Sequence, residues 1–264
     1  MTSSGPAGRL LPGERQRLIR QLARERSIVR VADLAHEFGV SEMTIRRDLD
    51  SLARSGHLEK TFGGAVMADQ AGIELSYKIR LQTNQRQKEA IAERAARRVQ
   101  EKSTVAIDAS TTGLALARTL VARELTVVTN SLDIAQELRA ARPSVILVGG
   151  SLRQTSGSFV GPLTLAALGH LRVDQTFFSC KGVVVPDGFM ESDLDETEVK
   201  RQLLACAACV TALVDSSKFG KRALACIATL DRAGTLITDQ GASKEVLAEL
   251  EAWGVKTCVA EVTA

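Results

Sequence analysis

Short apolar runs alternate with amphipathic runs from residue 104 to the end of the chain, and this alternation restricts the possible folds more than any other feature. The strand-like runs are 104–108, 125–129, 144–148, 175–179, 210–215, 235–238 and 257–262. The helix-like runs are 113–122, 132–141, 162–170, 194–208 and 243–252. The pattern predicts an α/β domain with a mostly parallel sheet, in which ligands bind at the carboxyl ends of the strands.

Small polar residues follow five of these predicted strands. They are the segments Asp108–Thr112, Thr129–Ser131, Gly149–Ser151, Cys180–Gly182 and Asp215–Lys218. A single hydroxyl-rich turn is more often only a helix cap than a ligand site. Because the carboxyl ends of parallel strands meet at one edge of the sheet, the five segments together favour a pocket.

The residue types in these turns indicate a hydroxylated, anionic ligand. Hydroxyls can bind the OH groups of a sugar, lysines supply positive charge, and a helix start can hold a dianionic phosphate. A phosphorylated sugar or polyol is therefore expected. Lys200 has two interpretations: it forms an i, i+4 surface pair with Glu196, or it points into the pocket.

The N-terminal segment has the pattern of a DNA-binding module. Residues 1–60 contain eleven Lys/Arg and eight Asp/Glu, so 11 − 8 = +3, equal to the formal net charge of the whole chain. Two amphipathic helices are expected at 14–25 and 31–38, with Gly39 after the second. Ser41 is a good N-cap for a third helix, whose inward face is formed by Ile45, Leu49 and Leu52. This order of elements predicts a helix-turn-helix over about 29–48.

The exposed face of the third helix carries groups that can contact DNA. Met43, Thr44 and Arg47 face outward and Arg46 lies on the flank. Arginine can bind guanine edges, and threonine can reach a phosphate or a thymine methyl. A solvated face, on which Asp48 and Asp50 pair with the two arginines, is the alternative. An extended piece with Lys60, followed by Gly63 and Gly64, suggests a two-stranded wing.

Residues 40–65, "VSEMTIRRDLDSLARSGHLEKTFGGA", resemble the signature of the DeoR family of bacterial transcriptional regulators. The Thr-Ile-Arg-Arg-Asp-Leu run and the Gly-Gly-Ala after the wing carry the resemblance. Many members have histidine at the position of Phe62 and arginine at that of Lys60. The resemblance implies that Thr44, Arg46 and Arg47 read the DNA, with Ser41 as the helix cap. Together with the exposed helix face and the wing, the predicted DNA-binding residues are Ser41, Met43, Thr44, Arg46, Arg47, Lys60, Gly63 and Gly64.

Residues 75–262 resemble the DeoR-family sensor domain, whose fold is similar to ribose-5-phosphate isomerase. The motifs are "DASTT", "VVTNS", "VGGSLR", "SFVGP", "DQTFFSCKGV", "ETEVKR" and "LVDSSKFG". The resemblance implies an effector site formed by Asp108, Ser110, Thr111, Thr112, Thr129, Asn130, Ser131, Gly149, Gly150, Lys181, Lys200, Asp215 and Lys218. The family usually has glycine at the position of Ser110, and serine would be strained there if the backbone φ were positive.

These observations predict a DNA-binding domain at 12–67, a linker at 68–83 and an effector-sensing domain at 84–262. The expected function is a transcriptional regulator, a repressor of a sugar or polyol catabolic operon that a phosphorylated sugar releases from its operator DNA. A palindromic operator requires a two-fold assembly, so a homodimer or homotetramer is expected. The alternative is a sugar-phosphate isomerase-like enzyme with Asp108, Asp215 or Glu198 as its base.

The remaining composition predicts neither a metal site nor a membrane protein. Histidines occur at 36, 57 and 170, far apart in the sequence, and the pair Cys206 and Cys209 has no second cysteine pair. No apolar run approaches the roughly 18 to 20 residues needed to cross a bilayer, and the N-terminus lacks the hydrophobic core of a signal peptide. We expect a bacterial cytoplasmic protein with reduced thiols, no cofactor and no catalytic residue.

Overall fold

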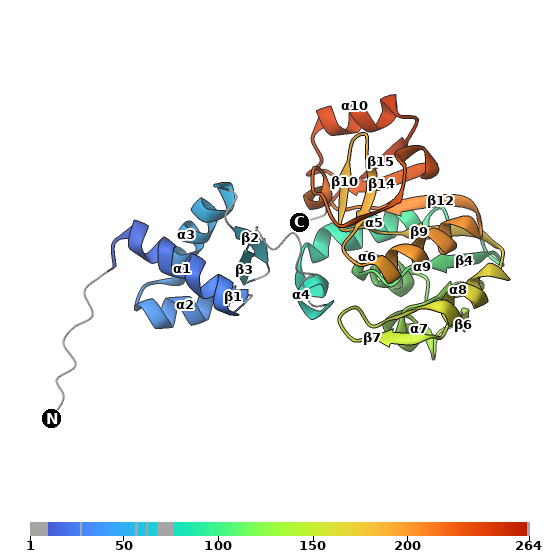
Figure 1. Cartoon of the computed structure of the whole chain (residues 1–264), viewed down its shortest axis with the longest axis horizontal. Helices are drawn as coiled ribbons and strands as arrows, with labels where there is room; N and C mark the ends of the chain where they lie inside the picture. The colour runs from blue at the N-terminus through green and yellow to red at the C-terminus, as the bar shows by residue number, and fades with distance from the viewer. Residues whose placement is uncertain (1–9, 27, 56–57, 62, 68–76, 263–264) are drawn as a thin grey trace. The chain divides into compact units, whose positions relative to one another are not determined.

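The computed structural model describes residues 10–26, 28–55, 58–61, 63–67 and 77–262. The chain divides into two compact units, residues 1–70 and 71–264 (Figure 1). The first unit consists of α1 (Pro12–Arg26), β1 (Ile28–Arg30), α2 (Val31–Phe38), α3 (Glu42–Arg54), β2 (Leu58–Thr61) and β3 (Gly64–Met67).

The first unit contains the predicted helix-turn-helix. Gly39 ends α2 in the left-handed conformation, with φ of 61°. Ser41 begins α3 as its N-cap, because its hydroxyl accepts a hydrogen bond from the backbone N–H of Thr44 at 3.3 Å. Ile45 and Leu49, on the inward face of α3, are buried in the core of the unit. The amphipathic pattern therefore gave the correct inward face.

The predicted two-stranded wing is present as the antiparallel pair β2 and β3, and β1 extends it to a three-stranded sheet. The antiparallel order is β1-β3-β2, and Gly64 of β3 lies opposite Arg30 of β1. A Cβ atom at Gly64 would lie 2.0 Å from the carbonyl oxygen of Val29, so this close approach requires glycine. Gly63 has a φ of 75°, and Phe62 lies outside the described residues.

The second unit is built on a seven-stranded, fully parallel sheet in the order β15-β14-β12-β9-β4-β5-β6. All seven predicted strands are present in this sheet, which confirms the α/β fold class. Their bounds, in chain order, are β4 (Thr104–Ile107), β5 (Thr126–Thr129), β6 (Ser144–Leu147), β9 (Val173–Phe178), β12 (Ala207–Leu213), β14 (Thr235–Asp239) and β15 (Lys256–Ala260).

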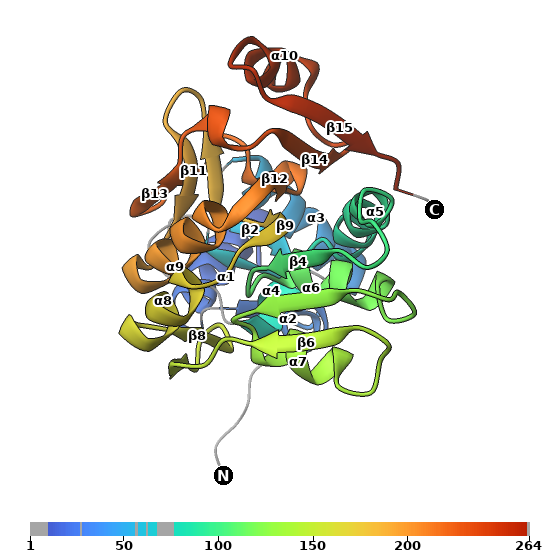
Figure 2. The ribbon, with the colours of Figure 1, turned by 90° about the vertical axis from the view of Figure 1, so that its right-hand side faces the viewer.

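Helices cover both faces of the central strands (Figure 2). In β4, Val105 and Ile107 pack in the cluster that contains α5 and α6, whereas Ala106 packs in the cluster that contains α8 and α9. Burial on both faces explains why these strands read as continuous apolar runs. The helices are α5 (Gln85–Ala96), α6 (Thr111–Thr119), α7 (Leu132–Leu138), α8 (Pro162–Gly169), α9 (Leu194–Ala205) and α10 (Lys244–Ala252).

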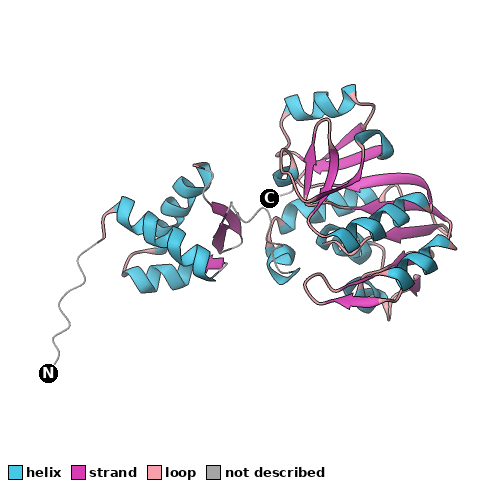
Figure 3. Ribbon diagram, viewed as in Figure 1, coloured by secondary structure: helices cyan, strands magenta, loops and turns pink. Residues whose placement is uncertain are grey.

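The rest of the second unit contains elements that the sequence pattern did not reveal (Figure 3). These are the antiparallel pair β7 (Ser151–Arg153) and β8 (Ser158–Val160), the antiparallel sheet β10 (Gly182–Val184), β11 (Gly188–Glu191) and β13 (Ala225–Ala228), and the 3-10 turns η1 (Ser216–Lys218) and η2 (Leu230–Arg232). Within the predicted linker, 68–83, residues 77–82 form helix α4 (Tyr77–Gln82). Residues 68–76 lie outside the described part of the chain.

The cysteines are free thiols, and Cys206 and Cys209 are not bonded to each other. Within the described ranges, no group of three or more His, Cys, Asp or Glu side chains could hold a metal ion. No helix in the described part of the chain has the length and apolar character of a membrane span.

Candidate functional site

The candidate effector site lies where the strand order of the parallel sheet reverses. From β4 the chain proceeds to β5 and then β6 on one side, whereas β9 pairs with the other side of β4. Ligands of open α/β sheets bind outside the carboxyl ends of the strands at such a switch point. Asp108 follows β4 and Ser179 follows β9, and the backbone N–H of Ser179 donates to Asp108 Oδ2 at 3.1 Å.

The turn after β4 shows how serine fits at position 110. Ser110 has an extended backbone with φ of −100°, so the strain considered for a positive φ does not arise. Its hydroxyl accepts from the N–H of Gly113 at 2.8 Å and donates to Asp108 Oδ1 at 2.6 Å. The buried hydroxyls of Thr111 and Thr112 form no hydrogen bond within the described residues. Thr111 and Thr112 therefore retain hydrogen-bonding capacity that Ser110 has already used.

Lys200 is a buried cation at the centre of the site and not half of a surface pair. Its Nζ lies 2.6 Å from Glu191 Oε2, 3.2 Å from Asp108 Oδ2 and 2.8 Å from the carbonyl oxygen of Ser179. Glu196, the proposed surface partner, instead accepts a hydrogen bond from the hydroxyl of Ser158 at 2.8 Å. The pocket interpretation of Lys200 is thus nearer to the structure, although its ammonium group is fully occupied by protein oxygens.

Electrostatics keep this buried cluster ionised. Burial alone would raise the pKa of Glu191, but Lys200 and Lys181 outweigh that effect and hold the pKa at about 2. Burial alone would lower the pKa of Lys200, but Glu191 and Asp108 raise it above its ordinary value. Lys181 is half-buried, with its Nζ 3.7 Å from Glu191 Oε1. Lys200 therefore acts as a fixed positive charge at neutral pH.

The turns after β5 and β6 are used mainly to hold the fold together. Thr129 is fully buried, and its hydroxyl donates to the carbonyl oxygen of Ile107 at 2.7 Å. Ser131 caps α7. The amide group of Asn130 donates to Phe159 O at 3.0 Å, while its Oδ1 is buried without a hydrogen-bond partner in the described structure. In this turn, Asn130 Oδ1 is therefore available to accept a hydrogen bond from a ligand.

The two glycines after β6 have a packing role. A Cβ atom at Gly150 would lie 2.1 Å from Thr164 Oγ1, and the carbonyl oxygen of Gly149 accepts from the same hydroxyl at 2.9 Å. The sequence interpretation was that the two glycines let a ligand approach the backbone. In the structure, the space beside Gly150 is filled by Thr164 of α8.

The turn after β12 brings a new element into the site. Asp215 is buried and accepts hydrogen bonds from the hydroxyl of Ser217 at 2.5 Å and from Asn84 Nδ2 at 2.9 Å. Although burial opposes ionisation, Lys218 and these hydrogen bonds hold the pKa of Asp215 below its ordinary value. Within the described structure, the partly exposed ammonium group of Lys218 forms neither an ion pair nor a hydrogen bond.

Sequence reasoning missed Asn84 and Lys88, both at the start of α5. Lys88 is buried, and its Nζ donates to the carbonyl oxygen of Arg80 in α4. The sequence contained a signal for Lys88, because it lies three residues before Ile91 on the apolar face of the predicted helix. It also missed Glu191, which belongs to the unpredicted strand β11.

The DNA-binding candidates on α3 lie at its exposed start. Ser41 and Met43 are exposed, Thr44 is partly exposed, and the hydroxyls of Ser41 and Thr44 lie 2.9 Å apart. Arg46 forms an exposed ion pair with Glu42 at 3.0 Å. Arg47 is exposed and pairs with no described residue, so its guanidinium group is available to DNA.

The solvated-face alternative assigned the wrong partners to the two aspartates of α3. Asp48 is buried and pairs with Arg15 of α1 at 2.5 Å. Asp50 pairs with Lys60 of the wing. Neither carboxylate pairs with Arg46 or Arg47. Arg46 pairs with Glu42 instead, so the positive charge that stays unpaired on this face within the described structure is that of Arg47. Gly63 and Gly64 shape the wing backbone.

A winged helix-turn-helix joined to a larger α/β unit is the architecture of a DNA-binding regulator. Comparison with known families agrees. Residues 15–71 match the DeoR-like helix-turn-helix domain, and residues 83–240 match the DeoR C terminal sensor domain. The chain belongs to the DeoR family of transcriptional regulators.

Two curated relatives illustrate the match. The chain is 39% identical to the uncharacterized HTH-type transcriptional regulator YulB of Bacillus subtilis over 94% of its own length and 96% of that protein. It is 31% identical to the glycerol-3-phosphate regulon repressor of Escherichia coli, with 86% and 90% covered. Among solved structures, ribose 5-phosphate isomerase A of Methanocaldococcus jannaschii aligns with a TM-score of 0.40 and 15% identity, over 53% of this chain and 56% of that one.

The relatives are regulators, and the chain is a regulator and not an enzyme. The side chains considered as a catalytic base all contact other protein groups. Asp108 and Asp215 are engaged by Lys200 and Asn84, and Glu198 is exposed and pairs with Arg201 at 2.6 Å.

Proposed function

We propose that the protein is a repressor of a sugar or polyol catabolic operon and that a phosphorylated sugar intermediate releases it from its operator. The observation that carries the proposal is the turn at Asp108–Thr112, where Thr111 and Thr112 keep unused hydroxyls. Lys218, in the turn after β12, contributes an ammonium group that forms no ion pair within the described structure. Hydroxyls, backbone N–H groups and a cation suit a phosphate attached to a polyol.

The proposed division of labour follows the two units. Residues 12–67 bind double-stranded operator DNA, and residues 84–262 bind the effector, with α4 attached to the sensing unit. A two-fold operator requires a homodimer or homotetramer, and access to the chromosome places the protein in the bacterial cytoplasm. An effector that binds the DNA-incompetent form more tightly lowers operator affinity; a coupling of about 1–3 kcal/mol corresponds to roughly 5- to 150-fold.

Arg47→Ala is expected to weaken binding to the preferred operator by about 1–3 kcal/mol and to relax base preference at one position. The reason is that Arg47 is exposed near the start of α3 and makes no ion pair with a described residue. The measurement is fluorescence anisotropy with a duplex recovered by selection from random sequences. Arg54→Ala, at the exposed end of the same helix, is the matched control. Equal losses for both variants would mean that α3 contributes only general positive charge.

A thermal-shift screen tests the effector class. Each sugar phosphate is compared with its unphosphorylated parent, and a true effector at 100 times its Kd stabilises the native state by about 2.7 kcal/mol. We expect one phosphorylated compound to raise Tm, its parent not to, and Thr111→Ala to lose the shift. The control variant is Thr126→Ala, at the end of β5 away from the candidate site, and it should keep the rise in Tm. A shift with free sugars but with no phosphate ester would refute the phosphate assignment.

A further inference from the structure

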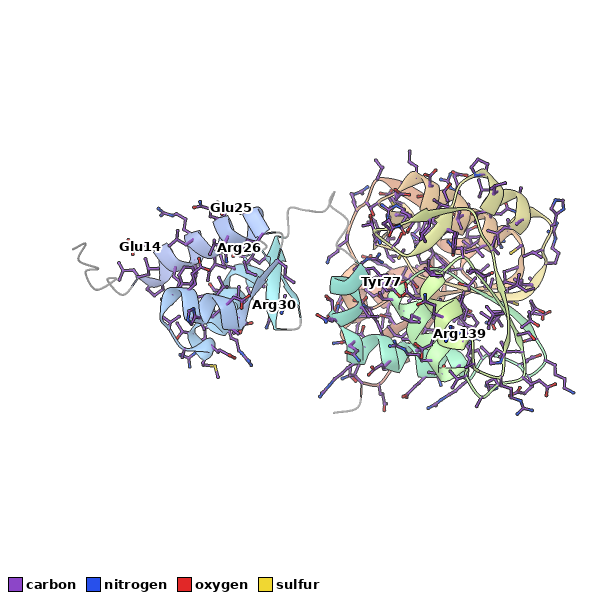
Figure 4. All side chains as sticks on the ribbon, turned by 90° about the horizontal axis from the view of Figure 1, so that it is seen from below. Glu14, Glu25, Arg26, Arg30, Tyr77 and Arg139 are labelled. Carbon is purple, nitrogen blue, oxygen red and sulfur yellow. The ribbon has the colours of Figure 1, made fainter. Side chains whose placement is uncertain are left out.

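Helix α4 is the first described element after residues 68–76, and it packs against other elements of the sensing unit. It contains six residues, too few to be stable alone, so its conformation depends on its attachments. It contacts α6, and Tyr77 and Leu81 pack against the core around α5 and α6. Tyr77 is the first residue of α4 (Figure 4). Its backbone N–H donates to Thr155 O at 3.1 Å.

A further attachment of α4 comes from the start of α5, beside the turn after β12. Lys88 Nζ donates to the carbonyl oxygen of Arg80, one turn along α4 from Tyr77. One turn before Lys88, Asn84 donates to Asp215 and to Ser217, both in the turn after β12. The start of α5 thus contacts the turn after β12 through Asn84, and it contacts α4 through Lys88.

Lys88 lacks the counter-charge that Lys200 has. Lys200 lies between two carboxylates, whereas Lys88 forms no ion pair within the described structure, and its hydrogen bond is to a neutral carbonyl. The charged groups that act on it are one carboxylate and three cations, namely Asp215, Lys218, Arg80 and Lys181. Burial lowers the pKa of Lys88 to about 7, and Asp215 offsets this only in part.

A cavity of about 400 Å³ connects Lys88 with the predicted phosphate turn. It lies between α4, α5 and α6, and its lining includes Lys88, Thr111 and Arg118. Two exposed carboxylates, Glu89 and Glu93, also line it, but neither forms an ion pair with Lys88 within the described structure. A group bound at Thr111 therefore has a path to the Lys88 ammonium without displacing the sheet. An anion there would supply the counter-charge that the protein does not provide.

We propose that Lys88 is an effector-binding residue whose ammonium group leaves the Arg80 carbonyl of α4 to bind the effector's phosphate. When a phosphate binds, Lys88 turns toward it, and α4 loses a hydrogen bond. The buried Tyr77 hydroxyl has no hydrogen-bond partner within the described structure. Losing the Lys88 hydrogen bond as well should therefore make local opening of α4 easier. This inference rests on the proposed phosphate effector and adds the route by which the site reaches the helix that follows residues 68–76.

The test uses the full-length protein, inorganic phosphate and the sugar phosphate with the largest shift in the screen. Lys88→Met is expected to weaken binding of both by about tenfold or more, the effect of losing one charged hydrogen bond. Lys244→Met, an exposed lysine at the start of α10, should bind as the wild type does. Calorimetry at pH 8 in two buffers should show that the wild type takes up more protons on binding than Lys88→Met, because binding charges a largely neutral lysine.

Amide hydrogen exchange over residues 77–82 tests the link to α4. Phosphate should speed exchange there in the wild type, and Lys88→Met should show the faster exchange without ligand. Undiminished phosphate affinity in Lys88→Met would overturn the proposal and leave the repressor function standing. Unchanged exchange in α4 would overturn the coupling. If no phosphate compound binds even the wild type, the proposed effector class fails, and this inference fails with it.

Discussion

Lys200→Met is expected to lower the free energy of unfolding of the sensing unit by about 3–5 kcal/mol, because it leaves two buried carboxylates without their cation. In the native protein, Glu191 and Asp108 both lie within 3.2 Å of the Lys200 ammonium. The measurement is urea unfolding followed by the fluorescence of Trp253, the single tryptophan of the chain, which belongs to this unit. Lys256→Met, an exposed lysine of β15, should change the transition little.

The pH dependence of the same variant has a definite sign. With Lys200 present, the pKa of Glu191 is about 2, below its unfolded value, so the stability from this pairing persists until the pH falls toward 2. Without Lys200, burial is opposed only by the more distant Lys181 and the backbone N–H of Ser192, so we expect the folded pKa of Glu191 to rise above the unfolded value. The folded variant then binds more protons than its unfolded chain, so its deficit should be smaller at pH 5 than at pH 8.

A double variant distinguishes an uncompensated charge from a simple cavity. Adding Glu191→Gln to Lys200→Met removes one buried charge and should restore part of the lost stability at pH 8. A deficit of less than about 1 kcal/mol in Lys200→Met would contradict the account. So would a double variant that is less stable than Lys200→Met.

The parts of the fold that the sequence predicted are those governed by local periodicity. The seven sheet strands are apolar because helices cover both their faces, and the inward face of α3 follows from Ile45, Leu49 and Leu52. The short antiparallel strands β10, β11 and β13 were not predicted. Each has three or four residues, too few for alternation to stand out, and β13 joins β11 from 34 or more positions away along the chain.

The same limit applied to the site. The five polar strand ends were visible, but a hydroxyl that caps a helix and one that binds a ligand look identical in sequence. Ser110 and Ser131 proved to be caps, whereas Thr111 keeps its hydroxyl free of protein partners in the described structure. Glu191 could not be assigned to Lys200, because their pairing depends on the unpredicted β11.

Asp48→Asn is expected to destabilise the DNA-binding unit by about 3 kcal/mol or more, because it leaves the Arg15 guanidinium buried without a counter-charge. Both side chains are 6% exposed, and they join α1 to the helix that carries the DNA-binding residues. The amide keeps an oxygen for hydrogen bonding, so the loss should fall near the lower end of the 3–5 kcal/mol typical of a broken buried pair. Circular dichroism reports the helices of both units, whereas Trp253 reports only the sensing unit.

Asp50→Asn is the matched control, two residues along the same helix. Asp50 pairs with Lys60, but both are exposed, so removing this charge should cost about 0–1 kcal/mol. Only Asp48→Asn should give an early dichroism transition while the Trp253 transition stays in place. If the two variants unfold alike, the Arg15–Asp48 pair does not hold α3 against α1. Operator affinity should follow the same order, because Arg47 can be presented to DNA only while α3 is docked in its unit.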